Sequence, residues 1–197
     1  MQGVFDFYQD LPVRPKRPER LFFGLFPDTE TALRVERFRQ RFLHDNLVEG
    51  TSLKRERLHL SLRHVGDYKR LRTALIYAAT QAGKAVAMRT FEVTFRSVAS
   101  LDGLAPIDGP PRARPLVLLG ESDALSALHE RLGAAMRKNG LPTATQFLPH
   151  MTLVYGSKTI PAQPIEPIRF AVNELVLVHS ALRLGRYNKI EGWPLED

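Results

Sequence analysis

Residues 57–62 read Arg-Leu-His-Leu-Ser-Leu, and residues 149–153 read Pro-His-Met-Thr-Leu. The two stretches share one order: a histidine, an apolar residue, a hydroxyl residue and a second apolar residue. Side chains on a strand point alternately to its two faces, so we expect His59 and Ser61 to share one face. His150 and Thr152 would do the same on the other strand. Each strand would then bury an apolar row and present an imidazole beside a hydroxyl.

Two histidines and two hydroxyls that face one site suit phosphoryl chemistry. Imidazole accepts or donates a proton near neutral pH, because its ordinary pKa is about 6.5. The hydroxyls of Ser61 and Thr152 can donate hydrogen bonds to phosphate oxygens. No acidic cluster with metal-ligand spacing accompanies either motif, so we expect no metal and no cofactor. These residues alone do not decide whether His59 or His150 is the acid.

Outward from the two motifs, apolar periodicity predicts an alternation of strands and helices. The expected strands cover 21–26, 57–65, 90–97, 115–120, 147–155 and 170–179, and the expected helices run from Asp28 to about Phe42, from about Tyr68 to Ala82, and from Ser122 or Asp123 to Gly140. A loop over 100–114, rich in Gly and Pro, divides the chain. Similar element order on its two sides hints at an internal duplication.

The composition is that of one globular domain. The 197 residues are 44% hydrophobic and 25% charged, which excludes a disordered or collagen-like chain. The absence of cysteine excludes disulfides and a thiol nucleophile. Apolar runs are too short to cross a membrane, and the N-terminus lacks the order of a signal peptide. We therefore expect a cytoplasmic protein with no membrane partner.

The N-terminal residues differ from the rest in composition. Residues 1–19 hold three prolines among basic side chains, which predicts an extended basic arm ahead of a single folded domain over 20–197. With a net charge of +7, the chain suits a polyanionic partner. Basic residues in and next to the arm (Arg14, Lys16, Arg17 and Arg20) could contact the phosphates of a long RNA, and a solvated tail is the alternative.

The paired motifs resemble the two H-x-[ST]-x signatures of the two-histidine (2H) phosphoesterase superfamily, and within it the bacterial RNA 2′,3′-cyclic phosphodiesterase family, also called 2′-5′ RNA ligases. The resemblance extends from Arg20-Leu21-Phe22-Phe23 to Trp193-Pro194-Leu195. It implies an α+β fold of two pseudo-symmetric lobes, with antiparallel sheets around a central cleft and helices on the outside.

The resemblance also implies roles for the motif residues. His59 would donate a proton to the leaving 3′ oxygen, and His150 would accept one from water, which gives a 2′-phosphate. Ser61 and Thr152 would bind the phosphate. The implied partner is RNA or a nucleotide with a 2′,3′-cyclic phosphate, and the protein would be a monomer.

Three positions depart from the family pattern. Many members have a small residue where this chain has Arg63 and an aromatic residue where it has His64. Many also have a basic residue at the position of Tyr155. By strict alternation Arg63 shares the face of His59, so we hypothesise that it supplies the phosphate charge that Tyr155 cannot. His64 would then lie on the buried row.

Several alternatives stay open. Tyr187 could close the cleft or stack on a base, or it could simply pack. The same site could join a 2′,3′-cyclic end to a 5′-hydroxyl end, act on a small cyclic-phosphate metabolite, or only bind RNA. A metal hydrolase is disfavoured because His59 and His64 are expected on opposite strand faces.

Overall fold

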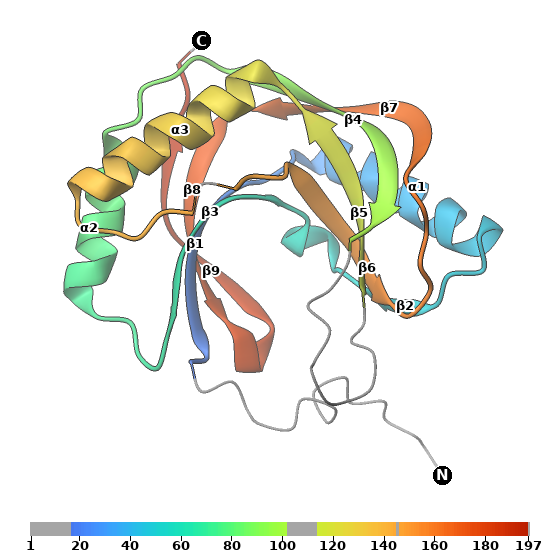
Figure 1. The fold of residues 1–197 in the computed structure, drawn as a ribbon, viewed down its shortest axis with the longest axis horizontal. Helices are drawn as coiled ribbons and strands as arrows, with labels where there is room; N and C mark the ends of the chain where they lie inside the picture. Colours follow the sequence, from blue (N-terminus) through green and yellow to red (C-terminus); the bar gives the residue numbers. More distant parts are fainter. Residues whose placement is uncertain (1–16, 102–113, 145, 197) are drawn as a thin grey trace.

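Helices and strands of the α+β class build the chain, as the sequence predicts. The computed structural model describes residues 17–101, 114–144 and 146–196, and in these ranges one antiparallel sheet of nine strands carries three α-helices on its outer side (Figure 1). The predicted arm lies mostly outside the described residues, including Arg14 and Lys16. The helices are α1 (Thr29–Asp45), α2 (Thr73–Lys84) and α3 (Asp123–Lys138), with short 3-10 turns η1 (Arg55–Arg57) and η2 (Leu182–Leu184). The strands are β1 (Glu19–Leu25), β2 (Gly50–Ser52), β3 (Leu60–Tyr68), β4 (Phe91–Ser100), β5 (Arg114–Glu121), β6 (His150–Gly156), β7 (Gln163–Val172), β8 (Glu174–Ala181) and β9 (Arg186–Pro194).

The sheet consists of two lobes that meet at the two histidine strands. The strand order is β7-β4-β5-β6-β3-β1-β8-β9, with β2 beside β6. We call β3-β1-β8-β9 the first lobe and β6-β5-β4-β7 the second. Between β3 and β6 the ladder has a single pair, Leu60 with Met151, so the two lobes join where the motifs lie.

The loop at 100–114 does not separate the lobes, which corrects the simple division of the chain. β4 and β5 flank this loop and pair with each other inside the second lobe. The last two strands, β8 and β9, return to the first lobe, and no α-helix follows β6 among the described residues. What repeats is strand, helix and antiparallel strand: β1, α1 and β3 in one lobe, and β5, α3 and β6 in the other.

Element boundaries follow local chemistry. Asp28 caps α1, because its side chain accepts a hydrogen bond from the backbone N–H of Thr31 at 2.7 Å. Helix α2 starts at Thr73 rather than Tyr68, because β3 continues to Tyr68. The expected strand over 170–179 is in fact the end of β7 and most of β8, with a break at Asn173.

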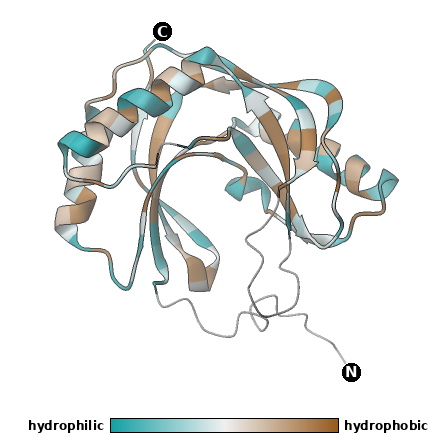
Figure 2. Ribbon diagram, viewed as in Figure 1, coloured by the Kyte–Doolittle hydropathy of each residue, from teal (hydrophilic) through white to brown (hydrophobic). Residues whose placement is uncertain are grey.

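The main core lies between the sheet and the helices. Apolar residues of the strands and of the helix faces toward the sheet fill it, and polar residues lie on the outward helix turns (Figure 2). A second, smaller cluster lies on the inner face of the sheet: Phe22, Val176 and Val178, with Phe26 and Tyr187 packed against it. Both faces of β1 are therefore buried, which explains its uninterrupted apolar sequence.

A β-bulge follows the hydroxyl residue of the first motif. Ser61 pairs with Gly24 of β1. Arg63 pairs with Phe23, the neighbouring residue, so Leu62 is an extra residue without a partner in this ladder. An extra residue of this kind reverses the alternation of side chains beyond it.

The second motif has a bulge at the equivalent place. Thr152 pairs with Val117 of β5. Val154 pairs with the neighbouring Leu116, so Leu153 is the extra residue. The pseudo-symmetry of the lobes thus extends to the irregularities of their central strands.

The first bulge overturns the placement of two side chains that strict alternation predicts. Arg63 is only 7% exposed and faces α3, so the hypothesis that it reaches the phosphate is wrong. His64 pairs with Phe22, a member of the inner-face cluster, and its side chain is 53% exposed. His64, expected on the buried row, therefore shares the inner face with Ser61.

Arg63 instead fastens β3 to α3. Its Nε and one terminal nitrogen donate to the backbone oxygen of His129 at 3.1 and 2.9 Å, and its other terminal nitrogen donates to the oxygen of Ala144. The guanidinium also donates to His129 Nδ1 at 3.2 Å. Since arginine has no acceptor, Nδ1 must be the unprotonated nitrogen of a neutral His129. The imidazole stacks on Phe147 at 4.1 Å between ring centroids.

We expect Arg63→Ala to destabilise the fold and to spare the chemistry. The change leaves the buried carbonyl of His129, the carbonyl of Ala144 and His129 Nδ1 without their donor, which costs about 2–4 kcal/mol. Urea unfolding measures this loss. Activity of the variant, assayed well below its unfolding midpoint, should stay close to that of the unaltered protein. Normal stability with lost activity would contradict this role.

Acidification should weaken the same contact. Burial and the nearby Arg63 lower the pKa of His129 from 6.5 to about 4, so between these values the unfolded chain binds more protons than the folded one. The free energy of unfolding should therefore decline as pH falls from 6.5 toward 4. Asn at position 129 can still accept from Arg63 but does not titrate, so His129→Asn should have a shallower pH dependence in urea unfolding. Equal slopes would refute this origin of the acid sensitivity.

Candidate active site

The two motif histidines are anchored in the same way. His59 Nδ1 lies 2.7 Å from the backbone oxygen of Arg57, and His150 Nδ1 lies 2.7 Å from that of Leu148. A carbonyl oxygen only accepts, so each Nδ1 must carry the hydrogen. Each neutral ring then has an unprotonated Nε2, and for His59 this nitrogen lies 3.0 Å from the Ser61 hydroxyl. The anchor fixes the tautomer that can accept a proton from a substrate.

The junction between the lobes brings the two motifs together. Because β3 and β6 run antiparallel around the pair of Leu60 and Met151, His59 and His150 flank this contact from opposite ends. His59 lies close enough to His150 for their charges to interact. The structure thus brings together the two predicted histidines, and it keeps Ser61 beside its own histidine.

Aromatic rings surround His59. Its centroid lies 5.1 Å from that of Phe22 and 5.6 Å from that of Phe26, on which it stacks. The Tyr187 ring meets it edge-on at 5.3 Å. Phe22 and Phe26 are functional candidates that sequence reasoning assigned to the core or left out. Because side chains alternate along a strand, Phe22 must face the side opposite to the buried Leu21 and Phe23. This alternation could have indicated from the sequence that Phe22 lies on the face of the site.

This environment controls the protonation of His59. Burial is the main cause that lowers its pKa from 6.5 to about 4, and electrostatic interactions with Arg57 and His150 act in the same direction. The hydrogen bond to the Arg57 carbonyl opposes the shift without cancelling it. In the free protein at neutral pH, His59 is therefore a neutral imidazole.

A charged triad occupies the inner face next to the histidines. Arg20 Nε and a terminal nitrogen donate to the two oxygens of Asp67 at 2.8 and 2.9 Å, and His64 Nε2 lies 2.9 Å from Asp67 Oδ1. Hydrogen bonds from Arg20 and His64 hold the pKa of Asp67 at about 2. Arg20, grouped with the basic arm in the sequence prediction, is thus a residue of β1 whose charge Asp67 neutralises.

His59 and His64, expected on opposite faces of the strand, both lie on the inner face, because the bulge at Leu62 reverses the alternation between them. This separation therefore does not disfavour a metal site. Among the residues that the structure describes, no three His, Asp or Glu side chains gather as a metal site. Metal independence remains a prediction of the sequence.

Both tyrosines among the predicted site residues reach the inner face. Tyr155, 42% exposed, lies within hydrogen-bond reach of Thr152 because the bulge at Leu153 turns them to one face. Burial and the neighbouring Tyr187 raise the pKa of Tyr155 above 10, so its phenol keeps its proton. Tyr187 contacts Phe22 as well as His59 and therefore packs against the site from β9.

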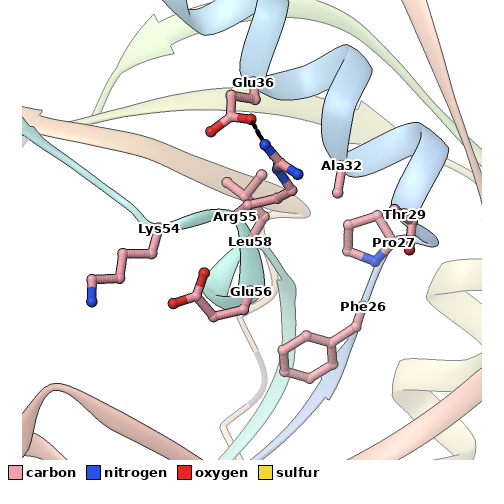
Figure 3. A pocket seen from close by; sticks show the side chains of 9 residues that line it. All are labelled: Phe26, Pro27, Thr29, Ala32, Glu36, Lys54, Arg55, Glu56 and Leu58. Atoms are coloured by element: carbon pink, nitrogen blue, oxygen red, sulfur yellow. Dashed lines mark hydrogen bonds and ion pairs between the residues drawn. The ribbon is translucent and has the colours of Figure 1, made fainter.

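An open pocket of about 680 Å³ borders the site between α1 and η1. Figure 3 shows Phe26 and Leu58 on its walls, and these two residues also adjoin His59. Its charged rim is balanced, since Glu36 accepts from Arg55 Nε at 2.8 Å while Lys54 and Glu56 are opposite in charge. The pocket extends the surface beside His59 but adds no net charge to it.

Solved structures of low sequence identity share this fold. Apo LigT of E. coli superposes with a TM-score of 0.69 at 24% identity, covering 92% of this chain and 99% of that chain. A structure described as a phosphoesterase has a TM-score of 0.69 at 21% identity, covering 91% and 100%. A Thermus thermophilus protein has a TM-score of 0.69 at 20% identity, covering 89% and 97%.

The chain therefore shares its fold with LigT and with the structure described as a phosphoesterase. The family model for the 2′-5′ RNA ligase superfamily matches residues 27–183, and the chain belongs to this superfamily. No curated protein matches the chain. Within the described residues, no helix is both long and apolar enough to span a membrane.

We expect His59 to titrate well below the ordinary imidazole pKa of 6.5 in the free protein. Proton NMR of the imidazole resonances, assigned with His59→Ala, should give a midpoint near 4. Phe26→Ala opens the aromatic surroundings to water, which stabilises the imidazolium, so the midpoint should rise toward 6.5. Leu47→Ala, at a distant exposed position, serves as the control. A midpoint near 6.5 in the unaltered protein would show that the rings do not exclude water.

Proposed function

We propose that this protein hydrolyses RNA 2′,3′-cyclic phosphate ends to 2′-phosphates, with His59 and His150 as the acid–base pair and without a metal. The observation that carries the proposal is the twofold motif: two histidines, each with Nδ1–H held by a carbonyl, meet at the lobe junction. Membership of the 2′-5′ RNA ligase superfamily supports the same chemistry. LigT of E. coli has been solved with phosphate and with 3′-AMP, which supports a phosphate-bearing nucleotide as the ligand.

The reaction needs one proton taken and one proton given. Nε2 of His150 accepts a proton from water as the water oxygen forms its bond to phosphorus. The bond from phosphorus to the 3′ oxygen breaks, and His59 Nε2 gives that oxygen a proton. The products are a 2′-phosphate and a 3′-hydroxyl. Ser61 and Thr152 hydroxyls donate to the nonbridging oxygens and hold the phosphorus between the two rings.

The donor role of His59 requires that substrate changes its protonation. In the free protein its pKa of about 4 leaves the ring neutral at pH 7. A phosphate anion placed against Nε2 favours the imidazolium and raises the pKa. We propose that His59 acquires its proton as the substrate binds.

A substrate with a good leaving group separates the two histidine roles. The p-nitrophenolate of a nucleoside p-nitrophenyl phosphate leaves without a proton, so His59→Ala should lose much less rate on it than on the cyclic phosphate. His150→Ala should lose rate on both substrates because water still needs its base. The reverse pattern would exchange the two roles.

Ligation is the second candidate, because the superfamily is named for it. Attack by an RNA 5′-hydroxyl in place of water would use the same histidines and form a 2′-5′ linkage. The cytoplasmic location and the monomeric state expected from the sequence stay predictions.

The test is an oligonucleotide that ends in a 2′,3′-cyclic phosphate, assayed in chelator with and without a 5′-hydroxyl RNA. We expect a 2′-phosphate product, with a loss of at least about 100-fold in His59→Ala and in His150→Ala. His44→Ala, an exposed histidine paired with Asp45, is the matched control. Loss of turnover in chelator would overturn metal independence, and a joined product would favour ligation.

A further inference from the structure

Arg57 is the last residue of η1, directly ahead of the first histidine strand. Its guanidinium carbon lies 4.5 Å from the centroid of the Tyr187 ring. Its Nε is buried, and among the described residues no group accepts a hydrogen bond from it. A buried donor without an acceptor costs about 1–3 kcal/mol, so a packing role alone leaves this atom unexplained.

Arg57 belongs to the immediate surroundings of His59. Its backbone oxygen accepts the hydrogen bond from His59 Nδ1, and the Tyr187 ring that it covers lies edge-on to the His59 ring. Its charge also acts on Tyr155 on the opposite strand. The guanidinium therefore lies close to His59, and its charge reaches Tyr155 on the strand of the second motif, although Arg57 is in neither motif.

The other arginines in or near the site are already occupied. Arg20 forms two hydrogen bonds with Asp67. Arg55, in the same 3-10 turn as Arg57, binds Glu36. Arg63 donates to buried carbonyls. Within the described part of the chain, no carboxylate pairs with Arg57, so its positive charge is available to a ligand.

We propose that Arg57 binds the phosphate of the substrate, donating from its guanidinium to nonbridging oxygens between the two histidines. This assignment rests on the proposed function and gives Arg57 the role first considered for Arg63. A phosphodiester anion supplies both the missing acceptor for a buried N–H and the missing counter-charge. The planar fork of arginine suits two phosphate oxygens, and the Tyr187 ring holds its plane.

Binding of inorganic phosphate and of a nucleoside 2′-monophosphate, by calorimetry, tests this role without turnover. Arg57→Met keeps the apolar stem over Tyr187 but removes the charge, and it should weaken both ligands by about 10- to 100-fold. Arg57→Lys restores the charge and should recover part of the loss. Arg55→Met, in the same turn but bound to Glu36, should bind like the unaltered protein.

Unfolding midpoints of the variants serve as a check that the site remains folded. If Arg57→Met folds normally and binds both ligands as tightly as Arg55→Met does, the assignment is overturned. If the unaltered protein binds neither ligand, the assignment also fails. Phosphate binding that depends on Arg57, without turnover of any cyclic phosphate, would retain this site and reject the proposed function instead.

Discussion

The antiparallel contact between β3 and β6 is the constraint on which the site depends. One ladder pair, Leu60 with Met151, joins lobes that otherwise have separate strand pairings. Each partner of that pair lies between a histidine and a hydroxyl residue, so the contact that closes the sheet also brings together the proposed acid–base pair. The apolar side chains between the polar ones are fully buried, which fixes the register. A slip by one residue would turn both imidazoles into the core.

Because of the bulges at Leu62 and Leu153, each histidine strand changes the face to which its alternate side chains point. Before the bulge, alternate residues present the catalytic groups to the inner face. Beyond it, the reversed alternation sends Arg63 into the core against α3 and turns His64 and Tyr155 toward the inner face. On β3, the extra residue decides which face each of two consecutive polar side chains occupies. Arg63 forms hydrogen bonds to α3, and His64 lies on the inner face beside the site.

Charge within the site is distributed unevenly. Asp67 neutralises Arg20, and Glu36 neutralises Arg55, whereas the aromatic rings exclude water from a neutral His59. Among the described residues, Arg57 is left without a carboxylate partner, beside a His59 ring whose Nε2 holds no proton in the free protein. In such surroundings a bound anion raises the pKa of the His59 imidazole. Binding of the substrate would therefore also protonate the proposed proton donor.

The sequence by itself determined the two motifs, their alternation, the α+β class and the family, because each depends on residues close together in the chain. The strands with clear apolar patterns were also predictable, and the helix after Asp28 was predictable from its cap. Only the tertiary structure decided that Arg63 is buried, that His64 is exposed and that Arg57 faces the site. A bulge arises from pairing with a neighbouring strand, β1 or β5, so the break in the apolar alternation after Leu62 and at Leu153 can be assigned to a bulge only once that pairing is known. The exchange of strands between the lobes was hidden for the same reason, since β8 pairs with β1 far along the chain and β9 then pairs with β8.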